Sequence, residues 1–161
     1  MTSAAVSGLL ATLPMTVWML GAQRFLLPSR ERFALPPEQI TDHIARAAGI
    51  RSVADQPVAR RTLTLINHFA YGAAAGTLYA PLRRAPGAVV VKGSALGLGV
   101  WAANYLGLLP VTGVLSNAVH HPARRNALMV VAHLIWGVGT AVMAEHLAQE
   151  EQRSVGRTAG L

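Results

Sequence analysis

The chain contains no cysteine and few charged residues. Without cysteine it forms no disulfide, no thiolate nucleophile and no cysteine-ligated zinc or iron–sulfur centre. Asp, Glu, Lys and Arg make up only 13% of its 161 residues, about half the fraction found in soluble domains. Hydrophobic residues make up 52%. This balance predicts a protein that resides in a lipid bilayer.

The charged residues are confined to short parts of the chain. Four stretches contain no Asp, Glu, Lys or Arg, namely residues 1–23, 62–82, 93–123 and 126–144. A helix needs about 20 apolar residues to cross the hydrocarbon core of a bilayer, and each stretch is close to that length or longer. We therefore predict an all-α, polytopic membrane domain over residues 1–148 and a polar, flexible tail at 149–161. The domain would be a four-helix bundle with spans at about residues 3–23, 62–81, 91–115 and 126–147.

Most of the charge is basic, and the net charge is +7. In a soluble protein this excess would suggest nucleic-acid binding. Here arginines occur in pairs at the edges of the uncharged stretches, so we predict contact with lipid headgroups and no nucleic-acid partner. The first and third loops contain more Lys and Arg than the second loop and the tail. The positive-inside rule therefore places both termini outside the cytoplasm.

Residues 37–48 in the first loop predict a short amphipathic helix. Prolines followed by Glu38 suit a first helical turn, and Gly49 suits a C-cap. Ile40, Ile44 and Ala47 share one face. This helix would lie either at the membrane surface or over the end of the bundle.

The two halves of the chain share a pattern that predicts an internal repeat. Each half contains a Trp followed by Leu-Leu-Pro, then a loop, an Arg-Arg pair and a His-x-x-aromatic-Gly motif. The matching positions are Trp18 with Trp101, Pro28 with Pro110, His68 with His133, and Gly72 with Gly137. Duplicated two-helix hairpins keep the same orientation, so the bundle would be two related hairpins in a parallel repeat.

The repeat would place His68 and His133 at a similar depth in the membrane. Each shares a helix face with small residues, among them Gly72, Gly76 and Gly137. One interpretation is helix packing, in which glycines bring the second and fourth spans together and each histidine bonds a carbonyl or a neighbour. A second is a cofactor site in which both histidines ligate a haem. A third is a proton-linked role, because imidazole titrates near neutral pH.

The remaining polar residues suggest no reaction chemistry. Asn104 lies in the middle of the third predicted span and is expected to bond across helices. His120 and His121 could approach His43 and Asp42, but nothing in the sequence fixes that geometry, so we predict no metal site. There is no nucleophile–base arrangement, phosphate loop or carboxylate pair, and we therefore predict that the chain is not an enzyme.

Two segments resemble the YagU-like group of bacterial inner-membrane proteins. These are Leu35-Pro36-Pro37 with Ile40-Thr41, and the motif His68-x-x-Tyr71-Gly72-x-x-x-Gly76-x-x-Tyr79. The resemblance implies a multi-pass protein of the bacterial inner membrane, which with the charge count gives periplasmic termini. It supplies no catalytic residues.

Taken together, these features predict an accessory or scaffolding subunit of a larger membrane complex. Its partners would be the lipid bilayer and either other membrane proteins or further copies of itself. One alternative is a membrane protein that binds haem or another small molecule through His68 and His133. Another is a small proton-linked transporter, whose pathway Asn104 and Thr112 would line together with the two histidines.

Overall fold

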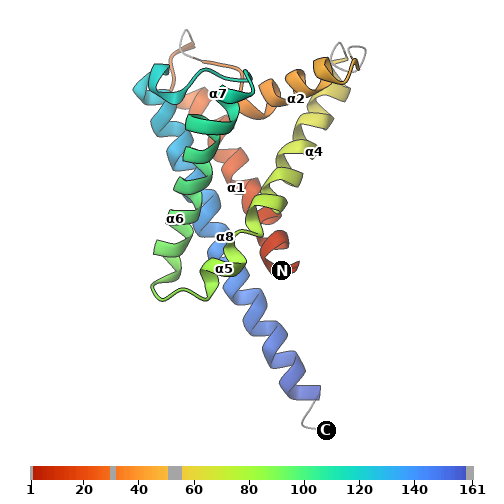
Figure 1. Cartoon of the computed structure of the whole chain (residues 1–161), viewed down its shortest axis with the longest axis vertical. Coiled ribbons are helices and arrows are strands. Elements are labelled where there is room, and N and C mark those ends of the chain that lie inside the picture. Colours follow the sequence, from red (N-terminus) through yellow and green to blue (C-terminus); the bar gives the residue numbers. More distant parts are fainter. Residues whose placement is uncertain (1, 30–31, 51–55, 159–161) are drawn as a thin grey trace.

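A computed structural model describes residues 2–29, 32–50 and 56–158, with side chains described as far as residue 154. Within these ranges all regular secondary structure is helical, so the all-α prediction is confirmed. Four long helical segments run in alternating directions (Figure 1). They are α1 (Thr2–Phe25), α4 (Pro57–Gly76), α6 (Val89–Ala102) and α8 (Ala123–Thr158). The start of α1 and the end of α8 consequently lie toward the same end of the bundle.

Short elements connect the long helices at both ends. At the end where α1 finishes, α2 (Pro36–Ala47) crosses the bundle, and α6 continues through the π-helix η2 (Ala103–Leu108) into α7 (Leu109–Val111). The 3₁₀-helix η3 (Ala118–His120) then leads into α8. At the opposite end, α5 (Tyr79–Arg83) joins α4 to α6. We call these two ends the α2 end and the α5 end.

Three helices are long and apolar enough to cross a membrane: Thr2–Phe25, Val89–Val111 and Ala123–Ser154. The second predicted span differs from the expected 62–81. Its helix α4 begins earlier, at Pro57, so that Arg60 and Arg61 lie within it, and it ends at Gly76. The chain then turns at Thr77, and the rest of the predicted span enters α5.

The predicted tail also differs, because α8 continues as helix to Thr158 instead of ending near residue 147. The residues that follow Ala144 include Leu147, Ala148, Gln149, Glu150 and Glu151. All of these are strong helix formers, so a helix that is already formed extends through them.

Small residues bring α1 and α4 into close contact. Gly8 of α1 faces Gly72 and Gly76 of α4. A Cβ atom on Gly76 would lie 2.7 Å from the carbonyl oxygen of Ala4 and 2.8 Å from the Cα of Gly8. Glycine is therefore required here because no side chain fits between the two backbones.

A second glycine contact joins α6 and α8. Gly93 and Gly97 of α6 face Gly137 of α8, and a Cβ atom on Gly93 would lie 2.8 Å from the carbonyl oxygen of Gly137. The sequence led us to expect Gly72 and Gly137 to bring the second and fourth spans together. Instead, each packs against the long helix that precedes it, which the spacing of glycines alone could not reveal.

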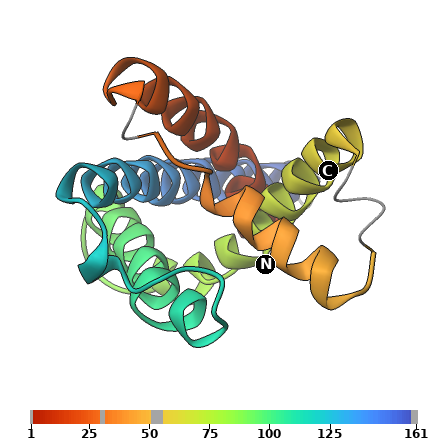
Figure 2. The same ribbon diagram turned by 90° about the horizontal axis from the view of Figure 1, so that it is seen from above.

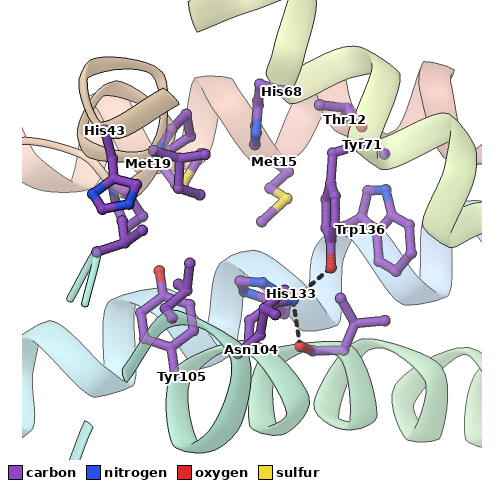
Figure 3. A pocket seen from close by; sticks show the side chains of 18 of the residues that line it. Thr12, Met15, Met19, His43, His68, Tyr71, Asn104, Tyr105, His133 and Trp136 are labelled. Atoms are coloured by element: carbon purple, nitrogen blue, oxygen red, sulfur yellow. Dashed lines mark hydrogen bonds between the residues drawn. The ribbon is translucent and has the colours of Figure 1, made fainter. Parts of the chain in front are cut away.

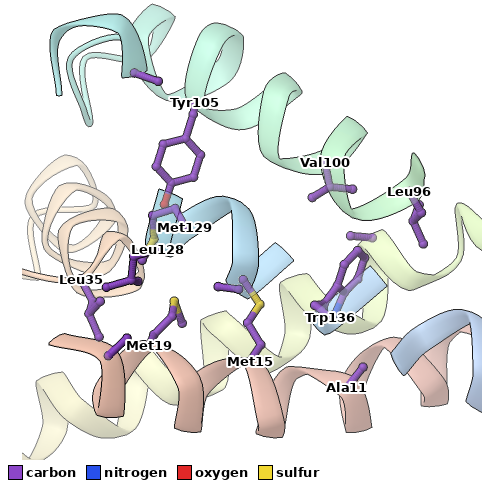
Figure 4. Close-up of a cluster of buried hydrophobic side chains, with 14 of the residues drawn as sticks. Ala11, Met15, Met19, Leu35, Leu96, Val100, Tyr105, Leu128, Met129 and Trp136 are labelled. Carbon is purple, nitrogen blue, oxygen red and sulfur yellow. The ribbon is translucent and has the colours of Figure 1, made fainter. Parts of the chain in front are cut away.

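The two helix pairs are joined along α1 and α8. Trp18 Nε1 donates to the carbonyl oxygen of Leu128 at 3.2 Å, and Trp136 Nε1 donates to the carbonyl oxygen of Gly8 at 3.0 Å. Apolar side chains fill the core beside this contact, among them Ala11, Met15, Met19, Leu128, Met129 and Trp136 (Figure 4). In the described part of the chain, α4 and α6 have no comparable contact.

The α5 end is closed by a cluster of hydrogen bonds on Glu145 of α8. The buried Tyr79 donates its hydroxyl to Glu145 Oε1 at 3.0 Å, and Arg83 Nε donates to Oε2 at 3.1 Å. Lys92 Nζ lies 3.6 Å from Oε1. One carboxylate thereby ties α5, α6 and α8 together.

At the α2 end, α2 lies across the bundle and contacts α4 (Figure 2). Arg60 of α4 makes two hydrogen bonds to the carboxylate of Asp42, both 2.7 Å long. Asn67 also donates to Thr41 Oγ1 at 3.3 Å. Helix α2 thus packs over the bundle end, and the position at the membrane surface that we also expected for it stays a prediction.

Candidate functional site: a cavity between the helix pairs

Where α4 and α6 diverge, they leave a cavity of about 340 Å³ (Figure 3). Every long helix contributes to its wall, and α2 covers one side. This volume lies in the range of small-molecule sites. The lining residues are Thr12, Met15, Met19, Pro36, Pro37, Ile40, His43, Ile44, His68, Tyr71, Gly72, Val100, Asn104, Tyr105, Leu108, Leu109, Thr112, Val114, His133 and Trp136.

The π-helix η2 forms one wall of the cavity and has a local cause. Pro110 has no N–H to bond the carbonyl of Leu106, and its ring crowds that carbonyl. The helix widens before the proline, and Asn117 Nδ2 donates to the Leu106 oxygen at 3.4 Å instead. π-Helical turns frequently occur at functional sites. This one carries Asn104 and Tyr105, both of which line the cavity.

His133 is held in one orientation on the α8 wall. Its Nδ1 lies 2.7 Å from the carbonyl oxygen of Met129, and Tyr105 meets its ring edge-on with centroids 5.8 Å apart. Because a carbonyl oxygen only accepts, Nδ1 carries the hydrogen in this contact. Nε2 of the neutral ring is then left with a lone pair and acts as a hydrogen-bond acceptor.

His68 lies on the α4 wall, and its side chain points into the cavity (Figure 3). Its Nε2 is buried and has no hydrogen-bond partner among the described residues. Leaving a buried polar atom without a partner is unfavourable by about 1–3 kcal/mol. A bound molecule that supplies this partner would therefore gain affinity.

Tyr71 and Asn104 form a polar bridge between α4 and η2. The Nδ2 group of Asn104 donates to the Tyr71 hydroxyl at 2.7 Å and to the carbonyl oxygen of Val100 at 2.8 Å. The bridge agrees with our expectation that Asn104 bonds across helices. It is also the one hydrogen bond described between α4 and the π-helix.

One side of the cavity is open, as the exposure of several lining side chains shows. Tyr71 is 47% exposed, Leu108 is 54% exposed and Ile44 is 51% exposed. They come from α4, η2 and α2, so the mouth lies on the side of the cavity that these three elements border. No Asp, Glu, Lys or Arg is among the described residues that line the cavity.

The structure brings some of the predicted site residues together and separates others. His68, His133, Asn104 and Thr112 all line the one cavity, as does Gly72. Gly76 and Gly137 lie in the helix contacts and take no part in the lining. The apolar lining residues, such as Met15 and Met19, could not be identified from the sequence. Apolar residues in an apolar span carry no signal that separates a cavity wall from a lipid-facing surface.

The histidines and acids at the α2 end do not assemble into a metal site. Asp42 bonds Arg60, His43 faces the cavity, and the described residues contain no group of three or more His, Asp or Glu with metal-binding geometry. His121 lies near Ser116. Burial lowers the pKa of His121, and the positive charge of Arg125 lowers it further.

The residues of the cavity fit a neutral molecule better than a haem. Nε2 of His133, with Nδ1–H on a backbone carbonyl, resembles a metal-ligating histidine. A haem, however, carries propionate carboxylates, and the described lining offers no Lys or Arg to pair with them. Burying unpaired carboxylates is strongly unfavourable.

Comparison with known proteins adds no relative. No family model, curated protein or solved structure matches this chain. The resemblance to the YagU-like group therefore stays a prediction.

Proposed function

We propose that the chain is a multi-pass protein of the bacterial inner membrane in which α4 forms a fourth, shorter crossing. The alternating directions of the four long segments support this topology. In α4 only the part after Arg61 is free of charge, about 22 Å of helix at 1.5 Å per residue. Its basic start would lie in the headgroup region, on the cytoplasmic side if both termini are periplasmic.

The bundle would consist of two related hairpins, α1 with α4 and α6 with α8. Support comes from the close glycine contact inside each hairpin, which involves Gly72 in one and Gly137 in the other. The two hairpins differ in their outer contacts, because α1 packs along α8 whereas α4 leaves α6 to form the cavity. A duplicated hairpin would account for this arrangement if the contact between α1 and α8 is kept and the corresponding contact between α4 and α6 has opened.

The function that the geometry supports best is the binding of a small, mainly apolar molecule in the cavity. The observation that carries this proposal is that one pocket gathers both intramembrane histidines with Tyr71 and Asn104, inside walls that are mostly apolar. Ligand sites commonly combine apolar walls with a few convergent polar groups. The mouth between α4 and η2 would open toward the lipid, so the ligand would come from the bilayer.

Native mass spectrometry of the protein from its native host tests this proposal. We expect a small molecule to co-purify and to be lost from His68→Ala and His133→Phe. His146→Ala changes an exposed histidine further along α8 and should retain it. An absorption spectrum of the same sample would identify a haem by its Soret band. Unaltered protein that carries nothing and binds no apolar probe would contradict the proposal.

A role as an accessory subunit of a larger complex is our second proposal. A face of α6 opposite its glycine contact stays uncovered and continues into η2. Ala95 and Gly99 of α6 and Ala103 of η2 are all exposed, and nothing lies within 4 Å of a Cβ on Gly99. Small residues spaced four apart let a further helix approach closely. Cross-linking in native membranes followed by mass spectrometry tests this role. Recovery of the protein only as an uncross-linked monomer would argue against it.

A further inference from the structure

The hydrogen-bonding groups of the cavity have fixed roles, and these limit the chemistry of a ligand. His133 already uses its Nδ1 hydrogen on the carbonyl of Met129, so its Nε2 can only accept. A ligand that bonds this nitrogen must therefore present a hydrogen, from a hydroxyl or an N–H group. A plain carbonyl or ether oxygen would face a lone pair.

Tyr71 has the opposite role at the mouth. Its oxygen accepts a hydrogen from Asn104, and its own hydroxyl hydrogen remains available for another acceptor. A hydroxyl group on a ligand meets both requirements, since it donates to one partner and accepts from another. A second hydrogen-bonding group lies on the opposite wall, where His68 Nε2 has no partner among the described residues.

The cavity walls limit the charge and the size of the ligand. No Asp, Glu, Lys or Arg lines the described cavity, so a charged ligand would be buried without a permanently charged partner. A cavity of about 150 Å³ is enough to hold benzene. The volume here, about 340 Å³, is more than twice that and accommodates a substituted ring with the first part of an attached chain. Trp136 and Tyr105 supply flat faces against which a ring can pack.

We propose that the ligand is a neutral, lipid-soluble molecule with a hydroxyl-bearing ring, of the hydroquinone type. Such a ring carries an O–H group at each end, one for His133 on α8 and one for His68 on α4, while its hydrocarbon chain leaves through the mouth into the bilayer. This inference rests on the proposed binding function and narrows it to one class of ligand.

Calorimetric titration of delipidated protein in detergent tests the proposal with two matched probes. One is decylhydroquinone, and the other is its dimethyl ether, which keeps the ring and the chain but has no hydroxyl hydrogen. We expect the hydroquinone to bind roughly thirtyfold more tightly, the effect of about two hydrogen bonds. In His133→Phe, which keeps a ring of similar size without nitrogen, the hydroquinone should bind more weakly, and its preference over the ether should fall to the part that the bond to His68 supplies. His146→Ala should keep the preference.

The outcomes separate this inference from the function on which it rests. If the ether binds the unaltered protein as tightly as the hydroquinone, the hydroxyl argument is wrong and the binding function stands. If neither probe binds and no molecule co-purifies, both proposals fail. If His133→Phe does not fold, Tyr71→Phe gives a second test, because loss of the hydroxyl at the exposed mouth should weaken hydroquinone binding. An unchanged affinity in Tyr71→Phe would overturn the assigned role of that hydroxyl.

Discussion

The contacts within the helix pairs and the space between the pairs are built in opposite ways. Inside each pair, glycines bring backbones so close that no side chain fits, as Gly76 against Gly8 and Gly137 against Gly93 show. Between α4 and α6, the walls carry large side chains such as Tyr71 and Tyr105, yet the space remains unfilled. Rigid, close-packed pairs therefore hold apart the walls of a cavity that their own side chains do not close.

This difference gives the glycines and the polar cavity residues separate roles, although both occur in apolar stretches of the sequence. In a bilayer the hydrophobic effect contributes little to helix association, so helices associate there through close van der Waals contact. The glycine contacts meet this need and leave the two histidines and the hydroxyl hydrogen of Tyr71 available for a ligand. Changes in the glycine contacts should therefore alter stability, and changes in the cavity should alter binding.

The largest effect is expected from filling a glycine contact. In Gly137→Leu, the new Cβ would lie 2.6 Å from the backbone nitrogen of Gly97 and 2.8 Å from its Cα, and neither atom can move away alone. We expect a loss of about 3 kcal/mol or more in the free energy of unfolding, at the upper end of overpacking effects. Unfolding in a denaturing detergent titration measures this. The matched control is Gly99→Leu on α6, where nothing lies within 4 Å. Equal stability of the two variants would contradict the account of the glycine contacts.

A smaller effect is expected at the closed α5 end. Glu145→Gln leaves Arg83 and Lys92 without a carboxylate, although Arg83 is 33% exposed and water compensates in part. We expect a loss of about 1–2 kcal/mol in the free energy of unfolding with no change in ligand affinity. Glu150→Gln is the control, because its pair with Arg153 is exposed on both sides and such pairs contribute less than about 1 kcal/mol. A change in ligand affinity in Glu145→Gln would show that the two ends are coupled.

The smallest effect on stability, less than about 1 kcal/mol, is expected where α2 docks on the cavity. Arg60→Ala removes both hydrogen bonds to Asp42 and loosens the helix that covers one side of the site. We expect ligand affinity to fall several-fold. Calorimetry checks the affinity, and Arg61→Ala, which changes the exposed neighbour, is the control. An affinity that Arg60→Ala leaves unaltered would mean that α2 takes no part in holding the ligand.

Much of the architecture follows from charge and hydropathy. The all-α class and the helices at α1, α6 and α8 could be predicted because a long part of each helix contains no Asp, Glu, Lys or Arg. The end of α4 could not, since Thr77 and the residues after it are as apolar as those before. The extent of α8 was also missed, because a polar segment of strong helix formers was interpreted as a tail.

The candidate site was predictable in its polar residues and not in its surroundings. A histidine or asparagine in an apolar span is unfavourable unless it faces the interior, and so His68, His133 and Asn104 could be identified. The partners of Gly72 and Gly137 could not, because a stripe of small residues indicates close contact without saying with which helix. The cavity itself depends on how α4 diverges from α6, which no local pattern records.

Methionine methyl NMR tests the central claim, the presence of an accessible apolar cavity between the helix pairs, most directly. Benzene enters cavities of this character whatever the natural ligand is. In delipidated protein with labelled methionine methyls, benzene should produce saturable shifts at Met15 and Met19, which line the cavity, and none at Met143, which does not. Equal shifts at all three, or no saturable shift at Met15 and Met19, would contradict the cavity and the binding function built on it.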